Sequence, residues 1–251
     1  MSKKMTEKQE FWLYGLHAVG SALLNQQRKK IKLLITKHSL ENLNLLLRGK
    51  KASDFCDVTI VEKNKISYAL GQDVTHQGLA MQVRPLNYEN DLKSFIKKQN
   101  PVLLVVLENI TDPHNVGAIF RSCLSFGVDG IVTTIRHTAK ESGAMAKAAS
   151  GALDVVPLIR IHNLRNAIQI LKDNDFWLSG FDAQTIQNIE KMTTTKKHAL
   201  IFGSEGEGMR QITKKNCDFL FRIPISKKID SLNVSNSVAV ALYHYKNLIP
   251  Q

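Results

Sequence analysis

Residues 101–127 read PVLLVVLENITDPHNVGAIFRSCLSFG. The apolar run at the start predicts a buried strand, and the Asp-Pro-His-Asn that follows predicts a turn into a helix, because Asp and Asn cap helices and Pro fixes φ. Gly127 is a natural helix stop. Turn chemistry does not explain Arg121, which stands on a mostly apolar segment. A buried or half-buried guanidinium needs a partner, so we expect Arg121 either to pair inside the protein or to meet an anionic ligand.

The same alternation of apolar strand and helix continues to the end of the chain. Strands that are apolar along their whole length, separated by helices, are typical of a parallel sheet covered on both faces. The sequence therefore predicts an α/β fold for residues 100–251. The further strands are expected in segments 128–134, 155–161, 176–182, 198–204 and 219–225. The helices are expected in segments 115–127, 141–153, 164–174, 209–216 and 231–247.

The N-terminal part predicts a smaller α/β domain of its own. Residues 11–25 place Ala18, Val19, Ala22 and Leu23 at helical spacing. Strands are expected in segments 29–37, 56–63 and 77–85, with a Ser-capped helix over 39–50 and a short helix over 65–72. We expect this domain to span residues 1–86, with a connection at 87–99 that is helical in pattern.

Charge and cysteine usage narrow the class of protein. The 251 residues carry 34 Lys and Arg against 22 Asp and Glu, a net charge of +12 that favours a polyanionic partner such as nucleic acid. Residues 1–88 hold 14 of the cations and 7 of the carboxylates, so the N-terminal third is the more densely basic part. Three cysteines without a CxxC pair fit free thiols. We expect a cytoplasmic protein with no metal site and no membrane span.

Three strand-to-loop junctions carry unusual polar residues. They read ENITDPHNVGAIFR, IFGSEGEGM and IPISKKIDSLNVSNS. Loops at the carboxyl ends of parallel strands gather at one edge of the sheet, where ligands bind. The three junctions together therefore predict one site.

The second junction is not a phosphate loop. It lacks both the GK[ST] ending and the GxGxxG spacing, and Glu205 and Glu207 would repel a phosphate. Glycines next to carboxylates suit a backbone turn pressed against a neutral or cationic ligand. A tight turn with positive φ at two glycines is an equally sufficient reason for the pattern.

The third junction places Ser231, Asn233, Ser235, Asn236 and Ser237 at the start of an apolar helix. One such residue is enough to cap a helix, and Ser231 and Asn233 are both good candidates. Five in seven positions exceed that need. Asn offers both a donor and an acceptor, which suits a nucleoside or a ribose.

These three tracts, in this order, resemble the three motifs of the SpoU (TrmH-like) family of SPOUT-class RNA ribose 2′-O-methyltransferases. The N-terminal tracts YGLHAVGSALLN and THQGLAMQV are similar to the small L30e-like substrate-binding domain of the bacterial 23S rRNA guanosine methyltransferases in this family. The resemblance implies a deep trefoil knot in the C-terminal domain, S-adenosylmethionine as cofactor, an RNA substrate, and a homodimer with the site at the subunit interface.

The resemblance also implies roles for individual residues. Arg121 would orient an RNA phosphate and the ribose, and would stabilise negative charge on the reacting oxygen, because a guanidinium stays protonated and is a poor base. Asn115 would fix the loop that carries Arg121, and Glu205 would orient Arg121 or Asn115. Ser231 and Asn233 would line the ribose and the methyl donor. The cofactor would be held by Phe202, Gly203, Ser204, Gly208, Ile223, Ile225 and Leu232.

Three alternatives stay open on the sequence. The same reaction on tRNA is the first, and the separate N-terminal domain counts against it. A non-catalytic RNA-binding protein is the second, and it would have no need of Asn115, Arg121, Glu205 and Asn233 together. A nucleotide-binding α/β enzyme is the third, and the absence of either glycine fingerprint disfavours it.

Overall fold

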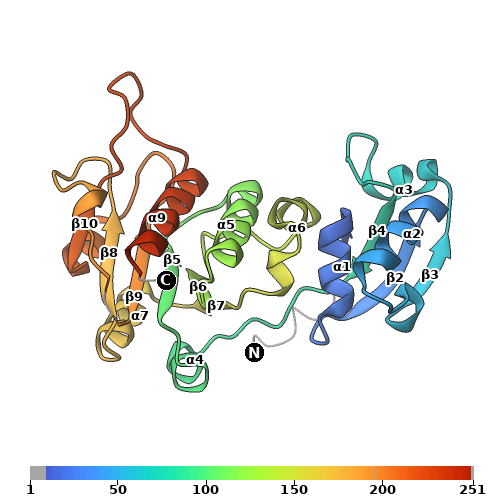
Figure 1. Ribbon diagram of the computed structural model, residues 1–251, viewed down its shortest axis with the longest axis horizontal. Helices are drawn as coiled ribbons and strands as arrows, with labels where there is room; N and C mark the ends of the chain where they lie inside the picture. The colour runs from blue at the N-terminus through green and yellow to red at the C-terminus, as the bar shows by residue number, and fades with distance from the viewer. Residues whose placement is uncertain (1–9, 195, 250–251) are drawn as a thin grey trace. The chain divides into compact units, whose positions relative to one another are not determined.

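The computed structural model describes residues 10–194 and 196–249 and divides the chain into two compact units. Unit 1 comprises residues 1–87 together with 141–155, and unit 2 comprises residues 88–140 together with 156–251. Figure 1 shows the elements of both units. Unit 1 is therefore built from two stretches of chain that are separated by more than 50 residues of unit 2.

Unit 1 contains a four-stranded mixed sheet in the order β1-β4-β2-β3. Strand β4 pairs antiparallel with β1 and β2, and β2 pairs parallel with β3. Leu13 and Leu33 are fully buried between more exposed neighbours, whereas on β4 the consecutive residues Leu79, Ala80 and Met81 are all buried. The strands are β1 (Phe11–Tyr14), β2 (Lys30–Ile35), β3 (Asp57–Ile60) and β4 (Leu79–Val83).

The helices of unit 1 refine the expectations from the sequence. The apolar residues expected at helical spacing within segment 11–25 lie on α1 and are buried. Residues 11–14 of that segment instead form strand β1, and Gly15 at φ 95° turns the chain between the two elements. The Ser cap expected for the next helix is wrong, because Thr36 caps it by accepting from the Ser39 backbone N–H. The helices are α1 (Leu16–Leu24), α2 (Lys37–Leu46), the short 3-10 helix η1 (Ala52–Asp54) and α3 (Lys63–Leu70).

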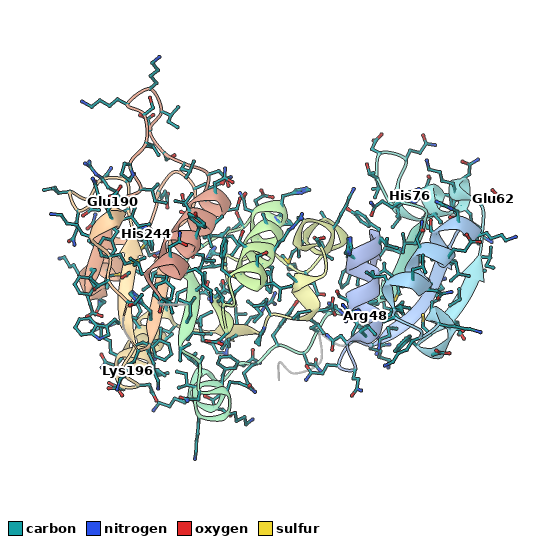
Figure 2. The ribbon with its side chains drawn as sticks, viewed as in Figure 1. Arg48, Glu62, His76, Glu190, Lys196 and His244 are labelled. Atoms are coloured by element: carbon teal, nitrogen blue, oxygen red, sulfur yellow. The ribbon has the colours of Figure 1, made fainter. Side chains whose placement is uncertain are left out.

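A buried imidazole joins α3 to the loop before β4. His76, labelled in Figure 2, is buried. Its Nε2 lies 3.0 Å from the Ser67 hydroxyl, and its Nδ1 accepts from the Gly78 backbone N–H at 3.1 Å. Burial lowers the pKa of His76, so the neutral ring is the folded form. The hydrogen bonds therefore fix a loop that has no regular structure of its own.

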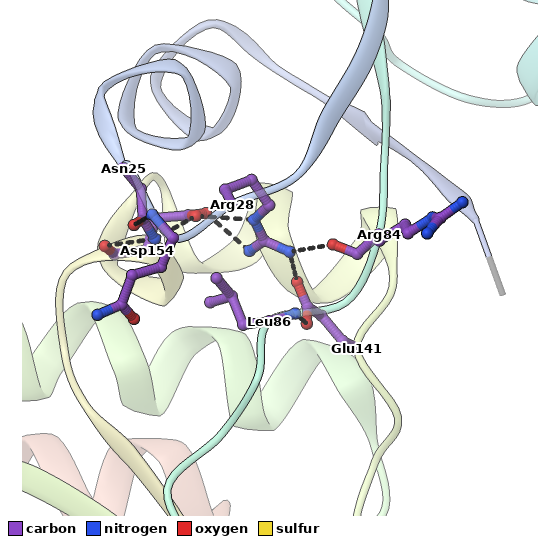
Figure 3. Close-up of polar contacts among 7 residues, drawn as sticks. Asn25, Arg28, Arg84, Leu86, Glu141 and Asp154 are labelled. Carbon is purple, nitrogen blue, oxygen red and sulfur yellow. Dashed lines mark hydrogen bonds and ion pairs between the residues drawn. The ribbon is translucent and has the colours of Figure 1, made fainter. Parts of the chain in front are cut away.

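The second stretch of unit 1 forms α6 (Gly143–Ala149) and η2 (Ala152–Asp154). Helix α6 packs on β1 so closely that a Cβ on Gly143 would lie 2.4 Å from the Trp12 carbonyl oxygen. Arg28 ties this stretch to the rest of the unit: its Nε and Nη2 donate to both oxygens of Asp154, and its Nη1 pairs with Glu141 (Figure 3). All three side chains are buried.

Unit 2 is built on a six-stranded sheet in the order β10-β8-β9-β5-β6-β7, in which every pairing is parallel. This confirms the parallel sheet expected from the apolar strands. All carboxyl ends of the strands therefore lie at one edge. The strands are β5 (Leu103–Leu107), β6 (Gly130–Thr134), β7 (Leu158–Ile161), β8 (Trp177–Phe181), β9 (His198–Phe202) and β10 (Phe219–Phe221).

Helices cover both faces of this sheet. One face packs Leu104 and Val106 of β5 against Phe95 of α4 and Leu171 of α7. The alternate residues Leu103, Val105 and Leu107 are buried on the other face, where α5 and α9 contact each other. The helices are α4 (Leu92–Gln99), α5 (Pro113–Ser125), α7 (Leu164–Lys172), η3 (Ile189–Lys191), α8 (Gln211–Asn216) and α9 (Val234–Leu248).

The ends of α5 follow the sequence closely. Asp112 caps its start by accepting from the His114 N–H, Pro113 occupies the first turn, and Gly127 stands just beyond its end at φ 71°. Among the described residues, no helix is long and apolar enough to cross a membrane.

Candidate active site

A pocket of about 640 Å³ opens at the carboxyl edge of the sheet, beyond β8, β9 and β10. Its walls come from two of the three polar junctions, namely segments 202–208 and 230–234, together with segment 181–184. Apolar side chains, including Phe202, Ile223, Ile225 and Leu232, face polar groups across it. This combination suits a ligand with both a flat apolar part and a polar part.

The glycine loop is a tight hairpin that forms one wall. Ser204 and Gly208 exchange backbone hydrogen bonds of 3.2 and 3.0 Å, and Gly206 and Gly208 have φ of 84° and 67°. Positive φ therefore explains these two glycines, as the turn interpretation expected. Gly203 has a different reason: a Cβ there would lie 2.0 Å from the Gly208 carbonyl carbon. Only glycine allows the two backbone segments to approach this closely.

Three remote side chains meet beside the pocket. The Asn115 amide donates to Glu205 Oε1 at 2.7 Å, and the Asn233 amide donates to the same oxygen at 2.7 Å and to Asn115 Oδ1 at 3.0 Å. Asn233 Oδ1 also accepts from the Ser235 N–H at 2.9 Å as the N-cap of α9. The carboxylate thus binds α5, the glycine loop and α9 together through charge-assisted hydrogen bonds.

The structure gathers most of the predicted site residues at this one place. Glu205, Ser231 and Asn233 line the pocket, and Asn115 reaches it through Glu205. The predicted cofactor contacts all line it as well; they are Phe202, Gly203, Ser204, Gly208, Ile223, Ile225 and Leu232. Their functional roles stay predictions at this point.

Arg121 departs from the expectation. The premise that it is buried or half-buried is wrong, because it lies exposed on α5. It does not pair with Glu205, whose Oε1 is taken by the two asparagine amides instead. Within residues 10–194 and 196–249 its guanidinium has no hydrogen bond or ion pair. An exposed arginine that stabilises nothing inside its own unit is open to an external anion.

Residues at the end of β8 belong to the pocket and were missed in the sequence. Phe181 stacks on Phe202 with ring centroids 4.7 Å apart, and Asp182 forms an ion pair with Lys214. The signal was present, since the segment FWLSGFD also leaves an apolar strand through an aromatic and a carboxylate. Unlike the three polar junctions, it carries no cluster of glycines or asparagines that would mark it as part of a site.

The charges around the pocket favour a cation. Asp182, Glu205, Glu207 and Asp230 line it, against Lys214 as the lining cation, which is neutralised by Asp182. A sulfonium ligand with an adenosine moiety fits this lining, because the negative walls complement its charge and the apolar side chains suit its base.

Thiol and metal chemistry find no support among the described residues. Burial raises the pKa of Cys217 to about 12 and that of Cys123 well above its usual value, so both thiols are protonated and weak nucleophiles. Over residues 10–194 and 196–249, no group of three His, Cys, Asp or Glu side chains is arranged to hold a metal ion.

The sheet, its edge pocket and the asparagine–glutamate cluster define an α/β enzyme whose ligand site lies at the carboxyl ends of the strands. Residues 102–243 match the sequence model of the SpoU rRNA Methylase family, and residues 12–89 match that of the RNA 2′-O ribose methyltransferase substrate-binding domain. The chain belongs to the SpoU family and is an S-adenosylmethionine-dependent tRNA/rRNA methyltransferase.

The chain is also similar to individual members of this family. The chain is 35% identical over 240 residues to an uncharacterized tRNA/rRNA methyltransferase of Synechocystis, covering 92% of this chain and 61% of that protein. It is 30% identical over 239 residues to the 23S rRNA (guanosine-2′-O-)-methyltransferase RlmB of Vibrio cholerae, covering 92% of this chain and 94% of that protein. The crystal structure of the AdoMet-bound rRNA methyltransferase of Sinorhizobium meliloti shares the fold, with a TM-score of 0.77, 19% identity and coverage of 98% of this chain and 90% of that chain.

Proposed function

We propose that the protein transfers a methyl group from S-adenosylmethionine to a ribose 2′-hydroxyl of 23S rRNA, at a guanosine. The observation that carries this proposal is the Asn115–Glu205–Asn233 cluster at the mouth of a pocket lined by carboxylates. The similarity to the Vibrio cholerae enzyme supports the choice of 23S rRNA and of guanosine. A non-catalytic RNA-binding protein would have no use for three polar side chains that are held together in this way.

S-adenosylmethionine supplies an electrophilic methyl group when bound, and this chain supplies orientation and charge. The loop 203–208 and the side chains of Ile223, Ile225 and Leu232, which line the pocket, would hold the cofactor. The carboxylates complement its positive charge. The methyl group would pass from sulfur to the ribose oxygen with loss of the hydroxyl proton to solvent, and the gain in rate would come from the residues that position the ribose beside the methyl donor.

Glu205 and the two asparagines form the positioning element. Because both amides donate to Oε1 of Glu205, its second oxygen is left for the substrate or for Ser231. Ser231 is exposed at the pocket and offers a hydroxyl to the ribose. Arg121 lowers the free energy of the developing oxyanion by its charge, with an RNA phosphate held beside it.

We propose that the active form is a homodimer whose subunits meet across α5 and α9, in the cytoplasm. These two helices contact each other and leave Leu124, Val240 and Tyr243 exposed, an apolar surface that a second copy would cover. Arg121 lies on the same helix as Leu124. A dimer would thus place the free guanidinium next to the partner's surface. We also propose a trefoil knot in unit 2, as the family resemblance implies.

Unit 1 is proposed to bind the RNA around the modified nucleotide. Lys30 and Lys50 both lie over the Phe55 ring, at 5.9 and 5.8 Å from its centroid, and Lys32 lies 5.6 Å from the Trp12 centroid. Cations and aromatic rings side by side suit RNA, because they meet both phosphates and bases.

The experiment combines binding with mapping of the product. Calorimetry should detect binding of S-adenosylmethionine to the purified protein. Mass spectrometry of nucleosides from a 23S rRNA transcript treated with protein and cofactor should find 2′-O-methylguanosine at one position. Methylation of a base, of tRNA alone, or of nothing would contradict the proposal.

A further inference from the structure

A second pocket, of about 350 Å³, lies at the carboxyl edge of the same sheet beyond β5, β6 and β7. Arginines from three different segments line it: Arg136 follows β6, Arg165 opens α7 and Arg210 precedes α8. We propose that this pocket binds a phosphodiester of the substrate RNA at a distance from the nucleotide that is methylated. The inference rests on the proposed function, because it takes the RNA to be the substrate.

Among the residues that the structure describes, two of the three arginines of this pocket make no side-chain contact that stabilises the fold, and the third makes a long one. Throughout the described part of the chain, the guanidinium groups of Arg136 and Arg165 have no hydrogen bond or ion pair. Arg210 reaches Glu108 only at 3.8 Å, and its side chain is 62% exposed. By contrast, the buried Arg28 of unit 1 is fully engaged by two carboxylates. Exposed, unpaired arginines are suited to bind an external anion such as a phosphate.

The charge balance of the pocket favours an anion. Glu108 is the carboxylate in its lining, and its two oxygens accept from the Arg210 backbone N–H at 3.0 Å and the Thr213 hydroxyl at 2.9 Å. Glu108 is buried, and both of its oxygens accept hydrogen bonds that stabilise the start of α8. Arg165 stands in the first turn of α7, where a cation is unfavourable for the helix itself. An anion bound beside it would remove that cost.

The turn that carries Arg136 is fixed in place. The Thr134 hydroxyl donates to the Arg136 carbonyl oxygen at 2.6 Å, and the Thr138 hydroxyl donates to the Thr134 carbonyl oxygen at 2.8 Å. His137 on this turn and Asn109 after β5 both have φ of 58° and both line the pocket. Left-handed backbone at non-glycine residues costs free energy and often marks a binding site.

The two pockets are lined by residues that are neighbours in sequence, which is why RNA is the expected ligand. Gly208 lines the cofactor pocket and Arg210 lines the second pocket, two residues further on. On α8, Lys214 faces the cofactor pocket and Thr213 faces the second pocket. A polynucleotide with one ribose at the cofactor pocket therefore passes this basic pocket along the same edge.

The test compares Arg136→Gln/Arg165→Gln with a control that loses the same charge elsewhere. The control is Lys97→Gln/Lys98→Gln, at the exposed end of α4, which leads into the amino end of β5 at the opposite edge of the sheet. Affinity for a 23S rRNA transcript is measured against salt concentration. Because the pocket is proposed to hold one phosphate, and each lost phosphate contact lowers the slope of log K against log salt by about 0.7, the slope of the pocket variant should be shallower by about 0.7. That corresponds to about 5-fold weaker binding at 0.1 M salt if the curves meet at 1 M.

The outcomes separate this inference from the proposed function. We expect the pocket variant to bind S-adenosylmethionine like the parent protein, to raise KM for RNA and to keep kcat. Equal slopes for the parent and the pocket variant, or an equal change in both double variants, would overturn the second pocket as an RNA site. Inorganic phosphate that binds the parent protein but not the pocket variant, with the RNA slope unchanged, would assign the pocket to a small phosphate ligand and overturn it as well. Failure of the parent protein to methylate any RNA would instead overturn the proposed function.

Discussion

The amide of Asn233 donates to the side-chain oxygen of Asn115 at 3.0 Å, across 118 positions of the sequence. Both amides also donate to Glu205, so each of the three polar junctions contributes one member to a closed cluster. Such a cluster is cooperative, because removing one member leaves the donors or acceptors of the other two unpaired.

Asn233→Ser should separate the two tasks of this side chain. Serine still caps α9, so the free energy of unfolding should fall only by the lost amide hydrogen bonds to Glu205 and Asn115, about 1–2 kcal/mol. It has no amide to donate to Glu205 and Asn115, and methyl transfer should fall by at least about ten-fold, as expected when a positioned polar group is removed. Asn233→Ala should lose about 1 kcal/mol of stability in addition. Thermal unfolding and single-turnover methyl transfer measure the two effects. Equal turnover by Asn233→Ser and the parent protein would show that the amide acts only within the fold.

Arg121→Ala should affect chemistry alone. The side chain is exposed and has no described partner, so the melting temperature and the affinity for S-adenosylmethionine should stay those of the parent protein. Loss of a cation that stabilises a developing oxyanion should lower kcat by about 10²–10³-fold. Arg121→Lys keeps the charge and should recover part of the activity. Normal turnover of the alanine variant at saturating RNA would rule out this role.

Gly203→Ala should disrupt the cofactor pocket. The added Cβ would lie 2.0 and 2.1 Å from the backbone of Gly208 and Met209, so the loop has to move. Gly206→Ala is the matched comparison: nothing lies within 4 Å of its Cβ, and its cost is the positive φ, about 1 kcal/mol. Calorimetry with S-adenosylmethionine should show a much larger loss of affinity for Gly203→Ala. Similar affinities for the two variants would mean that the close approach does not shape the pocket.

Arg28→Met should strongly destabilise unit 1. Burial lowers the pKa of Arg28, but its hydrogen bonds and the charges of Asp154 and Glu141 outweigh this and raise the pKa above its usual value. Removing the cation leaves two carboxylates buried without it, which costs about 3–5 kcal/mol. Arg48→Met, at an exposed position, should cost little. Denaturant unfolding of the two variants measures the difference, and a cost below 1 kcal/mol for Arg28→Met would be incompatible with this network.

His198 should make the free energy of unfolding of unit 2 decrease as the pH falls below about 6.5. Its ring is buried at the start of β9 and meets the Ser179 hydroxyl at 2.7 Å, and burial lowers its pKa to about 4. Above pH 6.5 the ring is neutral in both the folded and the unfolded chain, so it has no effect there. Below pH 6.5 the unfolded chain binds a proton that the folded chain refuses, and stability falls by up to about 3 kcal/mol by pH 4.

The unfolding of unit 2 can be followed by the fluorescence of Trp177, which pairs with His198 in the sheet, in a Trp12→Phe background. His198→Gln should remove most of the loss of stability between pH 6.5 and 4, whereas His38→Gln, at an exposed position, should keep it. An unchanged pH profile for His198→Gln would contradict the burial effect.

The sequence predicts strands and helices well where apolar runs are bounded by turn residues. The parallel sheet of unit 2 follows from uninterrupted apolar strands, and the pocket follows from polar residues placed after them. Strand β1 was not predicted, because FWLY is followed directly by a helical pattern and only the positive φ of Gly15 separates the two elements. The exposure of Arg121 was not predicted, because apolar residues next to it in the sequence do not show which face of the helix is turned to solvent.

Other features depend on tertiary contacts that no local pattern contains. Arg28 meets Glu141 and Asp154 over 113 and 126 positions of chain, and nothing in either segment indicates this pairing. The arginines of the second pocket come from three separate segments, each with an ordinary surface composition. The ion pair between Asp182 and Lys214 of the first pocket could not be predicted either, because the spacing of residues along the sequence does not indicate which remote charges will pair.

The interleaved make-up of unit 1 means that the protein cannot be cut in two at residue 88. A fragment that begins there would still carry residues 141–155, with Glu141 and Asp154 stripped of their arginine and the face of α6 that covers β1 laid bare. A fragment that ends there would lack that same cover. A fragment or domain exchange designed on this protein therefore has to move residues 141–155 together with residues 1–87.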